Sequence, residues 1–153
     1  MNCLLAPVPA VHLPDAIKLA KAGGVVAFGS KAYDTLKRLR DIGAVGTTPV
    51  YIYVSSTGFD RSDPQQQALK VGKVQFKGTL ADIVDANKHG RHPDPAKRPT
   101  STLTDTDSYI FWEVAGLTIL DPVLTLAQFS TATGKAYQTA PEGPVEAHLG
   151  QSN

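Results

Sequence analysis

Glycines interrupt two of the most strand-like stretches of this chain, and at each glycine the apolar alternation changes phase. In residues 69–76 the apolar side chains occupy odd positions before Gly72 and even positions after it. In residues 109–119 the same change occurs at Gly116. Such a change is typical of a β-bulge, which bends a strand. Two bent strands are what a small closed barrel or a strongly curved sheet requires.

Shorter periodic segments surround these two strands. Apolar stripes at helical spacing predict helices at 14–22, 31–42 and 79–88, and alternation or short apolar runs predict strands at 3–6, 25–28 and 50–54. Ser30 would cap the second helix, and Pro7 and Pro9 would end the first strand. The sequence therefore predicts an α+β fold, a small curved or closed β-barrel flanked by short helices. A three-layer α/β sandwich is the alternative.

The chain of 153 residues has the length of one domain. We expect that domain over residues 1–130, followed by a partly irregular C-terminal extension over 131–153. The single cysteine, Cys3, excludes an intrachain disulfide, and no apolar run approaches the roughly 20 residues that cross a bilayer. The sequence favours a cytoplasmic protein with no membrane partner, and it does not predict the oligomeric state.

Basic residues are concentrated in the first part of the chain, although the formal net charge is only +1. Residues 1–98 carry 14 Lys and Arg and 8 Asp and Glu, a net charge of +6. Residues 99–153 carry 1 basic and 6 acidic residues, a net charge of −5. Two outcomes are open: a one-sided basic surface that attracts a polyanion, or an interleaved surface on which the charges cancel.

Three segments follow one another along the chain: Pro49-Val-Tyr-Ile-Tyr-Val-Ser-Ser56, Val71-Gly-Lys-Val-Gln-Phe76 and the Trp-bearing Ile110-Phe-Trp-Glu-Val114. In pattern and order they resemble the EVE domain, a member of the PUA-like group of small barrels. The resemblance implies a PUA-like barrel and binding of nucleic acid that carries a modified base, often by base flipping. The segment from Gly29 also loosely resembles the ASCH motif G-x-K-x-x-E-x-R, with Gly29 and Lys31 at the glycine and lysine positions, Asp34 at the glutamate position and Leu36 at the arginine position. That likeness implies an amidohydrolase as an alternative.

The candidate ligand-binding residues lie at the junction before the second helix and on two aromatic strands. A helix N-terminus presents unpaired N–H groups to an anion, and aromatic rings stack on bases. We therefore expect a ligand to contact Phe28, Gly29, Ser30, Lys31, Tyr53, Ser55 and Trp112. A structural interpretation is also open, in which Ser30 caps the helix and the aromatic rings pack in the core.

Basic side chains in the second helix and in the long polar loop of residues 89–108 are candidates for contacts with a nucleic-acid backbone. They are Lys37, Arg38, Lys88, Arg91, Lys97 and Arg98. A solvated loop of this composition needs no function, so that interpretation is open as well. His89, His92 and Asp94 have a loose spacing with no cysteine or metal-binding helix beside them, and we expect no metal site.

These features predict a nucleic-acid binding module, for DNA or RNA, with a modified or flipped base in an aromatic cleft near Phe28, Tyr53 and Trp112. One alternative is an ASCH-like amidohydrolase acting on a modified nucleoside. Its candidate groups would be Lys31 as the amine, Thr35 as the nucleophile and Glu113 or Asp34 as the acid or base. The other is a protein-interaction domain without catalysis. The chain has no P-loop, G-x-G-x-x-G or G-x-S-x-G motif, so we expect no cofactor and favour binding over catalysis.

Overall fold

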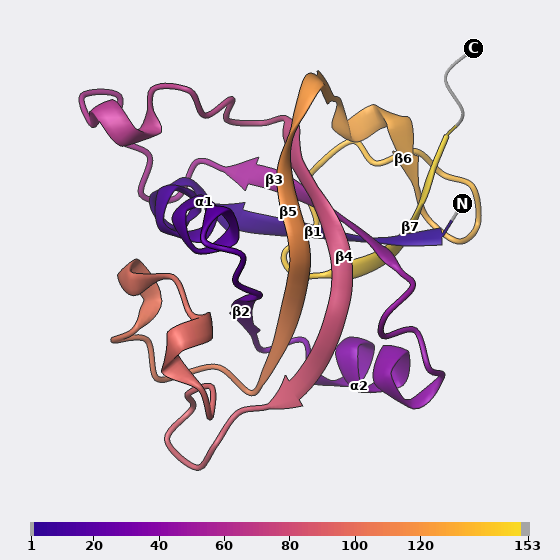
Figure 1. The fold of residues 1–153 in the computed structure, drawn as a ribbon. Helices are drawn as coiled ribbons and strands as arrows, with labels where there is room; N and C mark the ends of the chain where they lie inside the picture. Colours follow the sequence, from indigo (N-terminus) through magenta and orange to yellow (C-terminus); the bar gives the residue numbers. More distant parts are fainter. Residues whose placement is uncertain (1, 151–153) are drawn as a thin grey trace.

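A single mixed sheet of seven strands organises residues 2–150, which are the part of the chain that the computed structural model describes (Figure 1). The strand order is β2-β5-β4-β3-β1-β7-β6. β1 and β3 are parallel, and the other neighbouring strands are antiparallel. The strands are β1 Asn2–Pro9, β2 Val26–Ser30, β3 Pro49–Ser55, β4 Val74–Asp85, β5 Ile110–Leu124, β6 Phe129–Ser130 and β7 Val145–Leu149.

Two short α-helices and several 3-10 turns connect the strands. The helices are α1 Leu13–Lys21 and α2 Tyr33–Asp41, close to two of the helices that the sequence predicts. The turns are η1 Ala10–His12, η2 Pro64–Gln66, η3 Pro95–Lys97, η4 Thr100–Thr102 and η5 Leu126–Gln128. Within residues 2–150, neither helix has the length that a span of the bilayer requires.

The sheet is strongly curved because its two longest strands bend together. Figure 1 shows β4 and β5 as two long arcs that lie side by side. Their register shifts at three places, and at one of them Gly116 adopts a φ of 65°. A glycine in this left-handed conformation is typical of a bulge, so the bend predicted at Gly116 is confirmed. The predicted α+β class and curved sheet also agree with the structure, but the sheet stays open and does not close into a barrel.

The two faces of the sheet cover two separate cores, because successive side chains of a strand point to opposite faces. Along β1, Leu4, Ala6 and Val8 belong to the larger core, against which both helices pack. Cys3 and Leu5 belong to a smaller core on the other face. Phe129 of β6 and Ala147 of β7 complete the smaller core, so the C-terminal extension over 131–153 contributes one strand, β7, to the sheet. Residues 151–153 of that extension lie outside the described part.

The helix predicted at residues 79–88 is wrong, because β4 continues through this segment to Asp85. The error has a physical cause in a second bulge. Leu80 pairs with Val114 and Asp82 pairs with Glu113, so Ala81 is an extra residue in β4. The bulge places the buried Leu80 and Ile83 three residues apart on one face, and this spacing is the spacing of a helix.

Three local predictions also need correction. The strand predicted at 69–76 begins only at Val74, and Gly72 lies in the preceding turn. β1 continues through both of its prolines, because β7 pairs only with Asn2–Leu5 and leaves the later edge free of hydrogen bonds that a proline would break. Ala32, not Ser30, occupies the N-cap of α2, and the Ser30 hydroxyl accepts a hydrogen bond from the Ala32 amide at 2.9 Å.

Replacing Ile83 with Ala is expected to lower the free energy of unfolding by about 2–5 kcal/mol, because the side chain is 2% exposed and its loss leaves a cavity in the larger core. Ile119→Ala is the matched control, since Ile119 is 55% exposed and its loss should cost less than about 1 kcal/mol. Urea denaturation measures both. Equal losses would contradict the assignment of residues 79–85 to a strand that faces the core.

Candidate functional site

A cavity of about 170 Å³ opens where β1 and β2 end. Pro7 and Pro9 of β1, Phe28 and Gly29 of β2, and Trp112 of β5 form one part of its wall. The segment from Arg98 to Ser108 closes the other part. β1 and β2 are four positions apart in the strand order, and they can line one cavity because the sheet curls.

Two stacked and buried rings form the aromatic part of the wall. The rings of Phe28 and Trp112 stack at 4.6 Å between centroids, and both side chains are buried. The two residues pair across the sheet in the register of β2 and β5. Gly29 follows Phe28, and a Cβ at this position would collide with the Ser108 hydroxyl. The missing side chain at Gly29 therefore lets residue 108 approach the strand and shape the cavity.

Arg98 is the charged group that is buried deepest in the cavity wall, with 4% exposure. Its Nη1 donates to the Asp105 carbonyl at 3.3 Å, its Nη2 donates to the Thr102 carbonyl, and Cζ lies 5.2 Å from the ring centroid of Phe111. Within residues 2–150, the Nε of Arg98 has no hydrogen-bond partner, and no carboxylate is close enough for an ion pair. Burial lowers the pKa of this guanidinium.

The loop that carries Arg98 is attached to β5 by a buried carboxylate. Glu113 is 2% exposed and accepts hydrogen bonds from His92 Nε2 at 2.7 Å and from Lys97 Nζ at 3.0 Å. His92 Nδ1 accepts a hydrogen bond from the Asp94 amide, so a neutral His92 carries its proton on Nε2 and donates it to Glu113. The hydrogen bond to Glu113 raises the pKa of Lys97. These bonds hold residues 92–97 on the sheet and thereby place Arg98.

His12 lines the same cavity from η1. Its Nδ1 lies 2.8 Å from the Ser101 hydroxyl, and the Ser101 amide donates to the Asp15 carboxylate at 2.9 Å. Burial lowers the pKa of His12, and the charges of Asp105 and Asp15 oppose this effect. The imidazole is therefore neutral near pH 7 and fastens the loop to the segment before α1.

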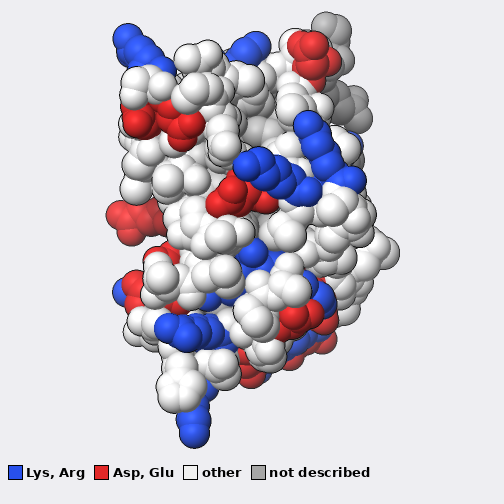
Figure 2. Space-filling view, turned by 60° about the vertical axis from the view of Figure 1, so that its left-hand side comes forward, with Lys and Arg blue, Asp and Glu red and all other residues white. Residues whose placement is uncertain are grey.

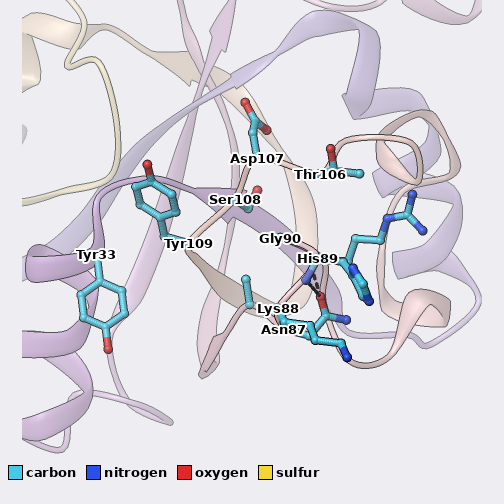
Figure 3. Close-up of a pocket in the computed structure, with 11 residues that line it drawn as sticks. Tyr33, Asn87, Lys88, His89, Gly90, Thr106, Asp107, Ser108 and Tyr109 are labelled. Atoms are coloured by element: carbon cyan, nitrogen blue, oxygen red, sulfur yellow. Dashed lines mark hydrogen bonds between the residues drawn. The ribbon is translucent and has the colours of Figure 1, made fainter.

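An open groove of about 950 Å³ adjoins the cavity, and the two share Asp107 and Ser108 in their walls. Tyr33 and Tyr109 lie on one side of the groove and the turn at residues 86–91 on the other (Figure 3). The Asn87 side chain accepts hydrogen bonds from the amides of His89 and Arg91 and thus shapes the turn. The turn presents Lys88 and Arg91, which are exposed, to the groove.

The structure gathers only some of the residues that the sequence singles out as ligand-binding. Phe28, Gly29 and Trp112 meet in the cavity. Tyr53 and Ser55 line a different pocket with Pro141, and Tyr53 packs against the smaller core. The hydroxyl of Ser30 bonds within its own turn, and Lys31 forms an exposed ion pair with Asp107 at 3.4 Å.

Of the basic residues predicted to contact a nucleic-acid backbone, some line the groove or the cavity and the others are paired with carboxylates. Lys88 and Arg91 line the groove, whereas Arg98 lines the cavity. Lys97 bonds to Glu113, so its ammonium group is already paired. On α2, Lys37 pairs with Asp41 at 2.7 Å and Arg38 pairs with Glu146 at 2.5 Å.

The site also contains residues that the sequence does not single out. They are His12, Tyr33, Asp105, Asp107, Ser108 and Tyr109. The length and polarity of the loop at 89–108 mark it as a candidate functional segment, and that signal leads to three of these residues. No sequence pattern marks His12 or Tyr33 as a site residue. They reach the site through the positions of η1 and α2, which only the folded structure shows.

Neither histidine of the loop is part of a metal site in the structure. His89 is exposed in the turn, and His92 is turned into the interior toward Glu113. Over residues 2–150, no group of three or more His, Cys, Asp and Glu side chains is arranged to hold a metal ion.

The chain matches no protein-family model and no curated protein. The likeness to EVE and ASCH domains therefore rests on the sequence segments and their order. The arrangement of the cavity and the groove has to be interpreted from its own chemistry.

Replacing Glu113 with Gln is expected to lower the free energy of unfolding by about 1–3 kcal/mol. The amide has one acceptor oxygen where two donors, from His92 and Lys97, converge, so one of them stays unpaired. Glu146→Gln is the control, since its ion pair with Arg38 is at the surface and contributes less than about 1 kcal/mol. Denaturant titration measures both, and an equal effect would contradict the role of Glu113 in holding the loop.

The free energy of unfolding should fall as the pH drops from about 7 to about 5, in part through His12. Its pKa is lowered in the folded state, so the unfolded chain binds this proton first, below the ordinary value of about 6.5. We expect His12→Asn to flatten this dependence. Denaturation at pH 7, 6 and 5 tests this, and an unchanged slope for His12→Asn would contradict it.

Proposed function

We propose that this protein binds nucleic acid and takes one base out of the strand into the cavity beside Trp112. The observation that carries the proposal is the adjacency of a narrow, partly enclosed cavity and an open groove that share Asp107 and Ser108. A strand that follows the groove passes directly over the opening of the cavity. Proteins that act on or read a flipped base need this combination of a backbone path and a pocket.

The cavity has a suitable size and lining for a planar group. Its volume of about 170 Å³ equals that of roughly six water molecules in the liquid, which is enough for a single base. Phe28 and Trp112 supply aromatic surface, and Arg98, His12 and Ser108 supply polar groups. A base that leaves its stack loses a few kcal/mol of stacking and pairing, and contacts of this kind offset that loss.

The groove has the features of a path for a single strand. Tyr33 and Tyr109 can stack with bases next to the one in the cavity, and Tyr109 is largely exposed. Lys88 and Arg91 are positioned for phosphates. The resemblance of residues 49–56, 71–76 and 110–114 to EVE domains supports the same function and a preference for a modified base.

The surface charge argues for a short binding site. Figure 2 shows Lys and Arg interleaved with Asp and Glu on the face that it draws. Ion pairs join the basic and the acidic parts of the chain, as in Arg38 with Glu146 and Lys31 with Asp107. The excess positive charge of residues 1–98 is thus partly neutralised, and few phosphates can be contacted. We expect modest affinity that depends on the base in the cavity.

The amidohydrolase alternative receives less support from the geometry. Both carboxylate oxygens of Glu113 are occupied by His92 and Lys97, and Lys31 is paired with Asp107. A group held in such bonds is poorly placed to transfer a proton to a substrate.

Fluorescence anisotropy with labelled DNA and RNA tests the proposal, using single and double strands, with and without methylated cytosine. We expect binding to single strands that weakens with salt. Lys88→Gln and Arg91→Gln should each lower the affinity and reduce the slope of log K against log salt by about one unit.

Lys73→Gln is the matched control for these variants. Lys73 is exposed just before β4, whereas the groove follows the other end of that strand. Its substitution should leave the slope unchanged. Absence of binding to every nucleic acid at low salt would overturn the proposal, and equal effects of all three substitutions would remove the groove from it.

A further inference from the structure

We infer that the cavity selects guanine and cytosine over adenine and uracil or thymine, and that Arg98 makes the selection. This inference rests on the proposed insertion of a base, and it names the chemical class of base that the cavity takes. The reason lies in the hydrogen-bond donors of Arg98 that have no partner in the protein and in the acceptors that Asp105 and Asp107 offer beside them.

Arg98 has more donors than the protein satisfies. A guanidinium has five N–H groups and no acceptor. Two of the five are used, in the bonds to the carbonyls of Thr102 and Asp105. The Nε is buried without a partner among residues 2–150 and has almost no exposed surface, so an occupant of the cavity does not reach it. The second N–H of Nη1 and of Nη2 has no assigned bond among the described residues. Because Arg98 lines the cavity, these two N–H groups are the donors left for acceptors that enter it or for water.

The buried charge of Arg98 also favours an occupant that accepts hydrogen bonds. Both of its protein partners are neutral carbonyls, and no described carboxylate forms an ion pair with it. A buried charge with incomplete compensation is unfavourable, and an occupant with electron-rich atoms offsets this. The contact with the Phe111 ring, together with the two bonds, holds the guanidinium plane in one orientation. A fixed planar fork favours a partner with two adjacent acceptors.

The carboxylates that line the cavity add the complementary requirement. Asp105 and Asp107 both contribute to its wall, and an ionised carboxylate only accepts hydrogen bonds. The site therefore offers a donor fork from Arg98 and acceptors from the two aspartates. An occupant that matches it has two adjacent acceptors and a separate amino group.

Two of the common bases meet this description. Guanine has O6 and N7 as adjacent acceptors and an exocyclic amino group, and arginine binds this edge in many complexes. Cytosine has O2 and N3 as adjacent acceptors and also carries an amino group. In adenine, the exocyclic group beside a ring acceptor is always the amino group, which is a donor. Adenine therefore does not present two adjacent acceptors. In uracil and thymine an N–H separates the two carbonyls.

The test uses short single strands in which one base stands among abasic sites, so that only this base can enter the cavity. Trp112 is the single tryptophan of the chain and lines the cavity, so its fluorescence reports occupancy. Anisotropy reports binding of the strand independently. We expect strands with guanine or cytosine to change the fluorescence and to bind about 5- to 150-fold more tightly than those with adenine or uracil.

Arg98→Lys keeps the charge and removes the planar fork, so it should abolish the preference among bases. Asp105→Asn is a second variant at an exposed position, and it should reduce the advantage of guanine over hypoxanthine, which lacks the amino group. Arg91→Lys in the groove is the control and should preserve the preference. The titrations of the unaltered protein decide the question even if Arg98→Lys does not fold.

The outcomes separate this inference from the proposed function. If all four bases change the fluorescence and bind equally, or if adenine or uracil binds best, the selection by Arg98 is overturned and base insertion stands. If strands bind but no base changes the fluorescence of Trp112, base insertion itself is overturned. If a fully abasic strand changes the fluorescence as strongly, the cavity binds phosphate, and the inference also fails.

Discussion

The carboxylate of Glu113 lies almost fully buried near the start of β5, where it accepts hydrogen bonds from His92 and Lys97. This interaction connects the long loop after β4 to the sheet. A buried carboxylate is stable only when its oxygens are paired, so the loop cannot leave without exposing or protonating the acid. The position of Arg98, one residue after Lys97, follows from this attachment, and so does the closed side of the cavity.

The curvature of the sheet is the second condition for the site. β2 and β1 lie far apart in the strand order and meet only because β4 and β5 bend at their register shifts. On a flat sheet, Phe28 and Pro9 could not line one cavity. The alternation of side chains gives the sheet two cores, with both helices packed against the larger one and with Phe129 and Ala147 of the C-terminal strands in the smaller one. The backbone irregularities that curve the fold therefore also create the pocket.

Ion pairs in the folded protein reduce the separation of basic and acidic residues that the sequence shows. The sequence separates a basic part from an acidic part, but Arg38 with Glu146 and Lys97 with Glu113 bring members of the two parts together. Of the basic candidates, Lys88 and Arg91 line the groove, while Lys37 and Lys97 neutralise nearby carboxylates. Charge along a sequence is therefore a weak guide to a binding surface in a protein whose strands pair across long separations.

The sequence by itself determined the class of the fold, the faces of the strands and the bend at Gly116. These features follow from the alternation of neighbouring side chains and from the conformational freedom of one glycine, which are local properties. It misplaced residues 79–85 because a bulge imitates the spacing of a helix. Only the tertiary structure decided that Arg98 and Glu113 are buried, that Tyr53 lies away from Trp112, and that His12 and Tyr33 join the site. The burial of a polar side chain depends on segments that are distant in the chain and adjacent in space, and no local pattern encodes which of them will meet.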